Sequence, residues 1–374
     1  MSSNIQEINK CSTIKILSVC ETVKGGIATY LNLIDRYKDN ELLHKIVLPD
    51  IHKDQLDSNS HKILYSGDKR GIARLVSLFK TTRKTIKVWE PDLIYFHSSF
   101  TMPIMAMFRI IGIKSKIIYC AHGWGALSLK KGSFKRKLIE ITEGYLCGFA
   151  NVAINISHNE INHARLVNYQ GNHVVIENAV SEPLLQPRLA GTKTIEPSPK
   201  LNILFVGRFD RQKGLDILLD AFKTASAKRN DLHLHVIGDS VLHKTNTSIS
   251  NSRHVTFYGW LTSTELEKHF LNADIVIVPS RWEGFGLVVA ESMRAGTPVM
   301  VSDKGSLPGL VDEGITGYIT QLNVPMLSEK LVSLSKSKLE SLRDNCYETY
   351  EKRFSAKRYI SEFKELYQNL CMGD

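Results

Sequence analysis

Short runs of apolar residues, many of them β-branched, alternate along the chain with stretches in which apolar residues return at helical spacing. Runs of this length and composition are typical of buried strands in a parallel sheet. They cover residues 13–20, 44–48, 92–96, 116–120, 152–156 and 173–176 in the first half, and residues 201–206, 232–238, 255–258, 274–278 and 299–301 in the second. The alternation predicts two parallel α/β sheets, each doubly wound with helices on both faces.

A stretch without periodicity separates these two halves. Residues 181–200 contain four prolines and one glycine, a composition that favours a linker. With 374 residues, the chain is long enough to form two domains with full hydrophobic cores. We therefore predict a first domain over residues 1–180 and a second domain that begins at residue 201.

A loop in the second half has the features of an anion site. The predicted strand over residues 274–278 leads into a loop with Gly284 and Gly286, and a helix is predicted over residues 287–294. The free N–H groups and the dipole of a helix N-terminus both attract anions. The pattern therefore predicts that this loop binds a phosphate.

Two carboxylates flank the same loop. Glu283 precedes the helix and Glu291 lies inside it, eight residues later. Because a carboxylate repels phosphate, we expect both groups to accept hydrogen bonds from hydroxyls, as in a site that holds a phosphate with a sugar on either side. The alternative is one surface glutamate and one glutamate that caps the helix.

A second loop places two cations at the end of a strand. Arg208 and Lys213 follow the predicted strand over residues 201–206, and two fixed cations there can neutralise a diphosphate. In the first half, Gly25 and Gly26 open the first helix and would allow a ligand to approach the backbone, although many such pairs are simple turns.

Three further polar residues, His97, His122 and Asn178, follow predicted strands of the first half. Ligands of doubly wound sheets bind at the carboxyl ends of strands, so each residue is a candidate. His122 precedes a glycine-rich loop, and its alternative role is a structural hydrogen bond. For His97 a structural role is the favoured interpretation.

The stretch from Glu283 to Glu291 resembles the E-x7-E motif of retaining, GT-B-type glycosyltransferases of family 4. The resemblance implies that Glu283 faces the donor sugar and that Glu291 holds the nucleotide ribose. It also implies a diphosphate-binding role for Arg208 and Lys213, and a contact between His122 and the donor sugar. The other residues that it implies in donor binding are Gly25, Gly26, Gly284, Phe285, Gly286 and Leu287.

The same resemblance implies the overall architecture, a GT-B fold in which two Rossmann-like domains face a cleft. Residues 1–180 would be the acceptor-side domain and residues 201–353 the nucleotide-sugar domain, with a helix over residues 354–374 crossing back to the first domain. Residues 304–309 depart from the family pattern, because Ser306 and Gly309 replace residues that are common there.

Charge is distributed unevenly along the chain. Of its net +10, residues 1–180 contribute most, with 24 Lys/Arg against 15 Asp/Glu. Two basic stretches, residues 69–87 and 130–137, also carry apolar residues, which favours contact with an anionic membrane surface over a solvated helix face. Nucleic acid is disfavoured as a partner, since no binding motif is present. No apolar run reaches the length of a membrane span.

The remaining composition argues against metals and cofactors. The six cysteines show no metal-binding spacing, and we expect reduced thiols in a cytoplasmic protein. No D-x-D sequence occurs, which disfavours a metal-held diphosphate, and no G-x-G-x-x-G fingerprint indicates an NAD enzyme. We expect no metal and no cofactor, with a nucleoside-diphosphate sugar as co-substrate.

Together these features predict a retaining, metal-independent glycosyltransferase in cell-surface polysaccharide biosynthesis. It would transfer a sugar from a UDP- or GDP-sugar to a lipid-linked saccharide, as a peripheral enzyme at the inner face of the cell membrane. Two alternatives stay open. One is a glycosyltransferase or phosphorylase acting on a soluble sugar, and the other is a non-enzymatic protein that binds nucleotide sugars.

Overall fold

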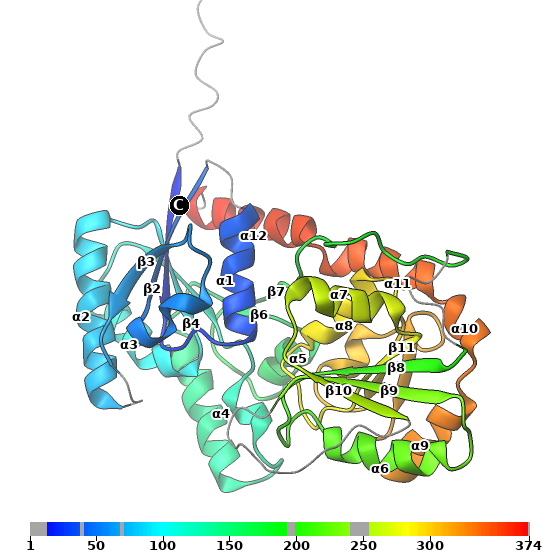
Figure 1. The fold of residues 1–374 in the computed structure, drawn as a ribbon. Coiled ribbons are helices and arrows are strands. Elements are labelled where there is room, and N and C mark those ends of the chain that lie inside the picture. Colours follow the sequence, from blue (N-terminus) through cyan, green and yellow to red (C-terminus); the bar gives the residue numbers. More distant parts are fainter. Residues whose placement is uncertain (1–12, 38–40, 68–70, 193–198, 240–253, 373–374) are drawn as a thin grey trace, which may run out of the picture. The chain divides into compact units, whose positions relative to one another are not determined.

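A computed structural model describes residues 13–37, 41–67, 71–192, 199–239 and 254–372 of the chain (Figure 1). The chain forms two compact units. The first contains the residues up to Ile156, then Ile161–Ile176 and the residues from Tyr359 on; the second contains Ser157–Glu160 and Glu177–Arg358. The described part of each unit is built around one parallel sheet.

The first unit contains a seven-stranded sheet in the order β3-β2-β1-β4-β5-β6-β7 (Figure 1). Its strands are β1 (Ile14–Cys20), β2 (Leu42–Pro49), β3 (His61–Tyr65), β4 (Leu93–His97), β5 (Lys116–Cys120), β6 (Val152–Asn155) and β7 (His173–Val175). Its helices are α1 (Gly26–Tyr37), α2 (Ile72–Trp89), α3 (Met102–Ile110) and α4 (Phe134–Cys147), with α5 (His158–Leu166) shared between the units. Short 3-10 turns cover Asp50–Gln55, Ser99–Thr101 and Gly125–Ser128.

The second unit contains a six-stranded sheet in the order β10-β9-β8-β11-β12-β13 (Figure 1). Its strands are β8 (Leu201–Val206), β9 (Leu232–Ile237), β10 (Val255–Gly259), β11 (Ile275–Val278), β12 (Val299–Ser302) and β13 (Gly317–Thr320). Its helices are α6 (Leu215–Ser226), α7 (Ser263–Asn272), α8 (Leu287–Arg294), α9 (Val324–Ser333), α10 (Lys336–Glu340) and α11 (Arg343–Thr349). A 3-10 turn at Leu307–Leu310 and a π-helical turn at Tyr350–Phe354 complete it, and α12 (Ala356–Met372) runs from this unit into the first.

Each sheet is stabilised by an apolar core under its helices. In the first unit, Leu78 of α2 and Phe108 of α3 pack with Ile94 of β4 in one buried cluster. In the second unit, Phe222 of α6 and Leu331 of α9 pack with strand residues in another. These cores use the apolar runs that predicted the strands, and the fold class is confirmed as two Rossmann-like parallel α/β domains.

The strand orders locate the ligand sites of such sheets. In the first sheet the order reverses between β1 and β4, and in the second between β8 and β11. Ligands of open α/β sheets bind at the carboxyl ends of the strands on either side of this switch point. The loops after β8 and β11 are therefore the expected ligand site of the second unit. They contain both predicted cations and Glu283, and the second carboxylate, Glu291, lies in the helix that follows.

Candidate functional site

Two loops meet at the switch point of the second sheet. The loop from β8 to α6 contains Arg208 and Lys213, and the loop from β11 to α8 contains Glu283. Hydrogen bonds tie the loops together: the Gln212 side-chain amide donates to the Trp282 carbonyl at 3.0 Å, and the Arg281 N–H donates to the Gln212 carbonyl at 2.7 Å. The two loops therefore act as one platform.

Two hydrogen bonds hold the carboxylate of Glu283 on this platform. Its Oε1 accepts a hydrogen bond from the Lys213 ammonium at 2.6 Å and another from the Ser280 hydroxyl at 2.9 Å. The side chains of Glu283 and Lys213 are 9% and 19% exposed, so water screens the ion pair only weakly. Among the described residues, no hydrogen-bond partner uses Oε2 of Glu283, which leaves that oxygen available to a ligand hydroxyl.

Arg208 lies in the same loop and is more open to solvent. Its guanidinium contacts Oδ2 of Asp210 at 3.1 Å and donates to the side-chain carbonyl of Gln212 at 3.2 Å. The side chain is 48% exposed, so the guanidinium remains reachable by a ligand. The structure therefore places both predicted cations beside carboxylates of the protein, and a diphosphate would compete for Arg208 with Asp210.

Two glycines permit the tight packing of the β11–α8 loop. Gly286 has a φ of 112°, and a Cβ there would lie 2.8 Å from a side-chain carbon of Leu307. Gly305 has a φ of 61°, and a Cβ would lie 2.7 Å from the Glu283 carbonyl oxygen. Because a side chain at either position meets both strain and close contact, the loop needs glycine there.

Ser306, one of the departures from the family pattern, has a structural explanation. The residue is buried, and its hydroxyl donates to the carbonyl of Phe285 and lies 3.2 Å from that of Glu283. It therefore fixes the backbone on which Glu283 sits. No local sequence signal identified this role, because the contact joins positions about twenty residues apart.

The other residues predicted in donor binding surround the start of α8. Phe285 is buried, with its ring against Phe354 at 5.8 Å between centroids, so its side chain packs in the protein interior. Its backbone, with those of Gly284 and Leu287, forms the approach to the helix N-terminus. The first N–H groups of this helix are the groups that the sequence predicted to bind an anion.

Glu291 lies within α8 and is half-buried. Burial raises the pKa of its carboxyl group, and the nearby Glu267 acts in the same direction, while Arg294 and Lys213 oppose the shift. A group with a raised folded-state pKa stabilises the fold below its unfolded-state pKa and loses that contribution as pH rises through the folded-state pKa. At neutral pH the raised pKa of Glu291 therefore reduces the stability of the ligand-free protein.

Replacing Glu291 by glutamine should raise the melting temperature of the ligand-free protein at pH 7 and lower its affinity for nucleotide. The first effect follows from removing a desolvated charge, and the second from weakening a ribose acceptor by about tenfold, the value of one hydrogen bond. Calorimetry of Glu291→Gln beside Glu329→Gln, an exposed glutamate of α9, measures both effects. A lower melting temperature with unchanged affinity would contradict this role.

In the first unit, the predicted glycine pair begins α1. Gly25 has a φ of 56°, and a Cβ there would meet no atom of the described residues within 4 Å, so the space beside this position is open. Gly26 is the first residue of the helix. The pair thus leaves exposed backbone after β1, next to the switch point of the first sheet.

His122 follows β5 in a left-handed backbone conformation, with a φ of 54°. A residue other than glycine rarely adopts this conformation, and such residues cluster at functional sites. The edge of the His122 ring system packs against Tyr30 of α1, with 4.6 Å between ring centroids and 85° between planes. The imidazole is therefore held in one place, although it remains half-buried.

A chain of hydrogen bonds leads away from His122 into the first sheet. His122 Nε2 lies 2.9 Å from Nδ1 of His97, and Nε2 of His97 lies 3.1 Å from the Ser18 hydroxyl. Ser18 lies 2.8 Å from Nε2 of His44, whose Nδ1 lies 2.8 Å from Oδ1 of Asp35. The sequence assigned no role to Ser18, His44 or Asp35, because the contacts depend on which strands are neighbours.

Asn178, the third candidate at a strand end, is buried in the second unit, and its backbone carbonyl accepts a hydrogen bond from Arg358 at 3.3 Å.

No group of three or more metal-ligating side chains occurs among the residues that the structure describes. Among the described helices, none is both long and apolar enough to span a membrane.

Two arginines of the predicted basic stretches do not lie on an exposed basic surface. Arg74 is buried and donates to the Glu21 carbonyl, so the prediction that it belongs to a basic surface is wrong. Arg136 is half-buried and paired with Glu140 at 2.7 Å. Residues 69 and 70 lie outside the described residues. The exposed cations of α2 are Lys80, Arg83, Lys84 and Lys87.

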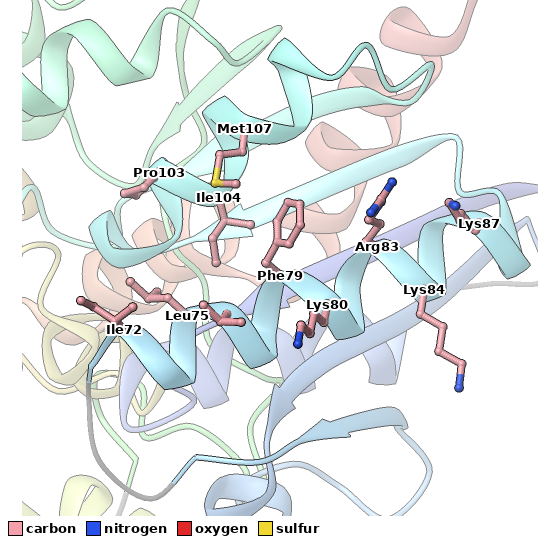
Figure 2. Close-up of a pocket in the computed structure, with 11 residues that line it drawn as sticks. Ile72, Leu75, Phe79, Lys80, Arg83, Lys84, Lys87, Pro103, Ile104 and Met107 are labelled. Atoms are coloured by element: carbon pink, nitrogen blue, oxygen red, sulfur yellow. The ribbon is translucent and has the colours of Figure 1, made fainter.

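These cations border an apolar groove between α2 and α3 (Figure 2). The groove has a volume of about 540 Å³. Figure 2 shows apolar side chains of both helices gathered along it, and they are Ile72, Leu75, Val76 and Phe79 of α2 with Pro103, Ile104 and Met107 of α3. Ile72 is 81% exposed, and Phe134 at the start of α4 is 83% exposed, which is unusual for residues of this size.

Comparison with known proteins identifies the family. Residues 192–353 match the family described as Glycosyl transferases group 1. An uncharacterized 41.2 kDa protein in the cps region of Klebsiella pneumoniae is 31% identical over 365 residues, which cover 94% of this chain and 99% of that protein. A lipopolysaccharide 1,2-N-acetylglucosaminetransferase of Salmonella typhimurium is 32% identical over 143 residues, covering 35% of this chain and 37% of that enzyme.

A solved structure with the same fold is that of Anabaena Alr3699/HepE in complex with UDP and glucose. It covers 94% of this chain and 99% of its own, with a TM-score of 0.73 at 19% identity. Together with the family match over the second half and the relative that matches nearly the whole length, this assigns the fold as GT-B. The chain belongs to the group 1 glycosyltransferases with the GT-B fold.

Proposed function

We propose that this glycosyltransferase takes a sugar from a nucleoside-diphosphate sugar, UDP- or GDP-linked, with retention of configuration and without a metal ion or other cofactor. The observation that supports this most strongly is the half-buried Lys213–Glu283 pair on the platform at the β8/β11 switch point. The relative of the same fold that was solved with UDP and glucose supports the donor class. The family 4 motif that the sequence resembles supports retention.

In this proposal different residues of the second unit contact different parts of the donor, which are the diphosphate, the ribose and the sugar. Arg208, Lys213 and the N-terminus of α8 stabilise the diphosphate as it leaves, because fixed positive charge lowers the energy of the developing anion. Glu291 accepts hydrogen bonds from the ribose. Oε2 of Glu283, which has no partner among the described residues, accepts a hydroxyl of the sugar while Oε1 stays with Lys213 and Ser280.

None of these side chains is placed here as a covalent nucleophile. We therefore propose front-face attack, in which the acceptor hydroxyl forms the new glycosidic bond as the bond to the diphosphate breaks. The departing phosphate oxygen takes the acceptor's proton, so that charge and atoms balance. His122 contacts the sugar from its own domain and orients the ring.

The anomeric configuration of the product tests this mechanism. With an α-linked donor sugar, we expect an α-linked product by NMR, formed at the same rate with and without a chelator. A β-linked product would contradict retention. Loss of activity with chelator that returns on adding a divalent cation would contradict metal independence.

We further propose that the acceptor is a lipid-linked saccharide at the inner face of the cell membrane. The α2–α3 groove supports this, because its apolar residues suit lipid chains and its bordering cations suit phosphate head groups. The lipopolysaccharide enzyme and the cps-region protein among the relatives support a setting in polysaccharide biosynthesis. A glycosyltransferase acting on a soluble sugar would not need such a surface.

The protein should sediment with vesicles of anionic phospholipid, and binding should weaken as salt rises. Exchanging Lys80, Arg83, Lys84 and Lys87 for glutamine should weaken binding by two orders of magnitude or more, at about 1 kcal/mol for each cation near an anionic surface. A matched control exchanges four exposed lysines of the second unit, Lys223, Lys228, Lys268 and Lys338. Equal losses in both variants, or binding that ignores salt, would contradict a specific membrane surface.

A further inference from the structure

We infer that Asp35, His44, Ser18 and His97 are positioning residues that fix the protons of the His122 ring, so that its Nδ1 presents a lone pair to a hydroxyl of the ligand. The inference rests on the proposed role of His122 at the donor sugar. It concerns which hydrogen bond the imidazole can make, and it follows from the four contacts that link His122 to Asp35.

Asp35, at the far end of this series of hydrogen bonds from His122, sets the direction in which each bond is donated. The Asp35 carboxylate is acceptor-only, so the ring nitrogen that faces it at 2.8 Å, Nδ1 of His44, carries a proton. We infer that this is the only proton on the ring, so that Nε2 of His44 is a bare acceptor. The Ser18 hydroxyl, 2.8 Å away, has a single proton and donates it to that nitrogen.

The remaining links follow one by one. Because the Ser18 hydroxyl donates its one hydrogen bond to His44, its oxygen can only accept a hydrogen bond from Nε2 of His97. That nitrogen therefore carries the N–H. Burial lowers the pKa of His97 well below the usual histidine value and that of His122 to about 3, so both rings are neutral near pH 7. A neutral His97 with its proton on Nε2 has a bare Nδ1, and this nitrogen accepts from Nε2 of His122.

His122 is left with its proton on Nε2 and a lone pair on Nδ1. Nδ1 has no hydrogen-bond partner among the residues that the structure describes, and the ring is half-buried. The packing of Tyr30 against the ring and the left-handed backbone hold the imidazole in this orientation. A bare imidazole nitrogen accepts a hydrogen bond from a hydroxyl and has none to donate, so the chain favours a sugar hydroxyl over a phosphate oxygen as the ligand of His122.

Nitrogen NMR of the histidine rings tests the inference without any ligand. In protein labelled with ¹⁵N-histidine, we expect His122, assigned from its loss in His122→Gln, to show a protonated Nε2 and a bare Nδ1. Ser18→Ala removes the hydroxyl at the centre of the hydrogen-bond series. The signals of both His122 nitrogens should then shift toward those of a mixture of the two tautomers. Asp35→Asn, which removes the charge at the inner end, should act in the same direction if Ser18→Ala does not fold.

Ser60→Ala is the matched control, since Ser60 is a buried serine of the same unit whose hydroxyl has no partner among the described residues. It should leave the His122 signals unchanged. A proton on Nδ1 of His122 in the wild type, or unchanged His122 signals in both Ser18→Ala and Asp35→Asn, would overturn the inference.

A kinetic comparison separates this inference from the proposed function. Ser18→Ala should raise the KM for nucleotide sugar about tenfold, the value of one hydrogen bond, while the affinity for the free nucleoside diphosphate stays unchanged. If the tautomer shifts but the KM does not, the lone pair of His122 does not contact the sugar, and the functional half of the inference is overturned. If no nucleotide sugar is a substrate at all, the proposed function fails, while the NMR result still decides the tautomer.

Discussion

Replacing Glu283 by glutamine is expected to reduce sugar transfer by about 10²–10³-fold, the cost of removing one group that stabilises a transition state. Glutamine has nearly the same shape, so the loop between β11 and α8 should keep its fold. The substitution removes the negative charge of the carboxylate. Oε1 of that carboxylate pairs with the Lys213 ammonium at 2.6 Å and accepts a hydrogen bond from the Ser280 hydroxyl at 2.9 Å. The rate of sugar transfer at saturating donor measures the effect.

The control for this variant is Glu329→Gln, which removes an exposed carboxylate of the same unit. Circular dichroism should show that both variants are folded, and only Glu283→Gln should lose activity. The double variant with Lys213→Met should lose less than the sum of the single effects, because groups in one ion pair are not independent. Full activity of Glu283→Gln would contradict the assignment of this site.

Replacing Arg208 by alanine should remove most of the affinity for nucleoside diphosphate and nearly abolish transfer. The guanidinium is half-exposed after the end of β8, and its hydrogen-bond partners among the described residues are Asp210 and Gln212, so it can turn to a ligand without leaving a buried charge unpaired. The expected loss is about 2–3 kcal/mol, the value of a hydrogen bond to a charged group, or about 30- to 160-fold in affinity.

Arg211→Ala is the matched control for this loss. Arg211 lies in the same loop, three residues on, and its side chain is exposed. Removing it takes away an equal charge from the same loop, so general attraction for anions falls by a similar amount in both variants. A loss in both variants would indicate that binding is non-specific, and a loss in neither would contradict the role of the β8–α6 loop.

Much of the fold followed from the sequence because buried parallel strands have a strong local pattern. The strand over Leu201–Val206 and the helix over Leu287–Arg294 match their predicted bounds. The two strands that were not predicted, β3 (His61–Tyr65) and β13 (Gly317–Thr320), are edge strands. An edge strand is partly exposed and needs no continuous apolar run, so its sequence resembles that of a loop.

The site divides in a similar way. The loop glycines of the second unit, its two cations and Glu283 occur in short strings, so local sequence and the resemblance to the family motif grouped them. Ser306 and the hydrogen bonds that link Ser18, His44 and Asp35 could not be found in this manner, because each contact joins separate elements of the fold. Arg74 could not be placed from the sequence either. Its positive charge is visible there, but its burial beside Glu21 depends on the fold.

The central claim is that the platform after β8 and β11 binds the diphosphate of a nucleotide sugar. Titration calorimetry of UDP, GDP and ADP, without metal, against the wild type and Arg208→Ala tests it most directly. We predict that one of the three binds the wild type in the micromolar range and that Arg208→Ala loses this binding. If none of them binds the wild type, or if both proteins bind equally well, the claim is contradicted.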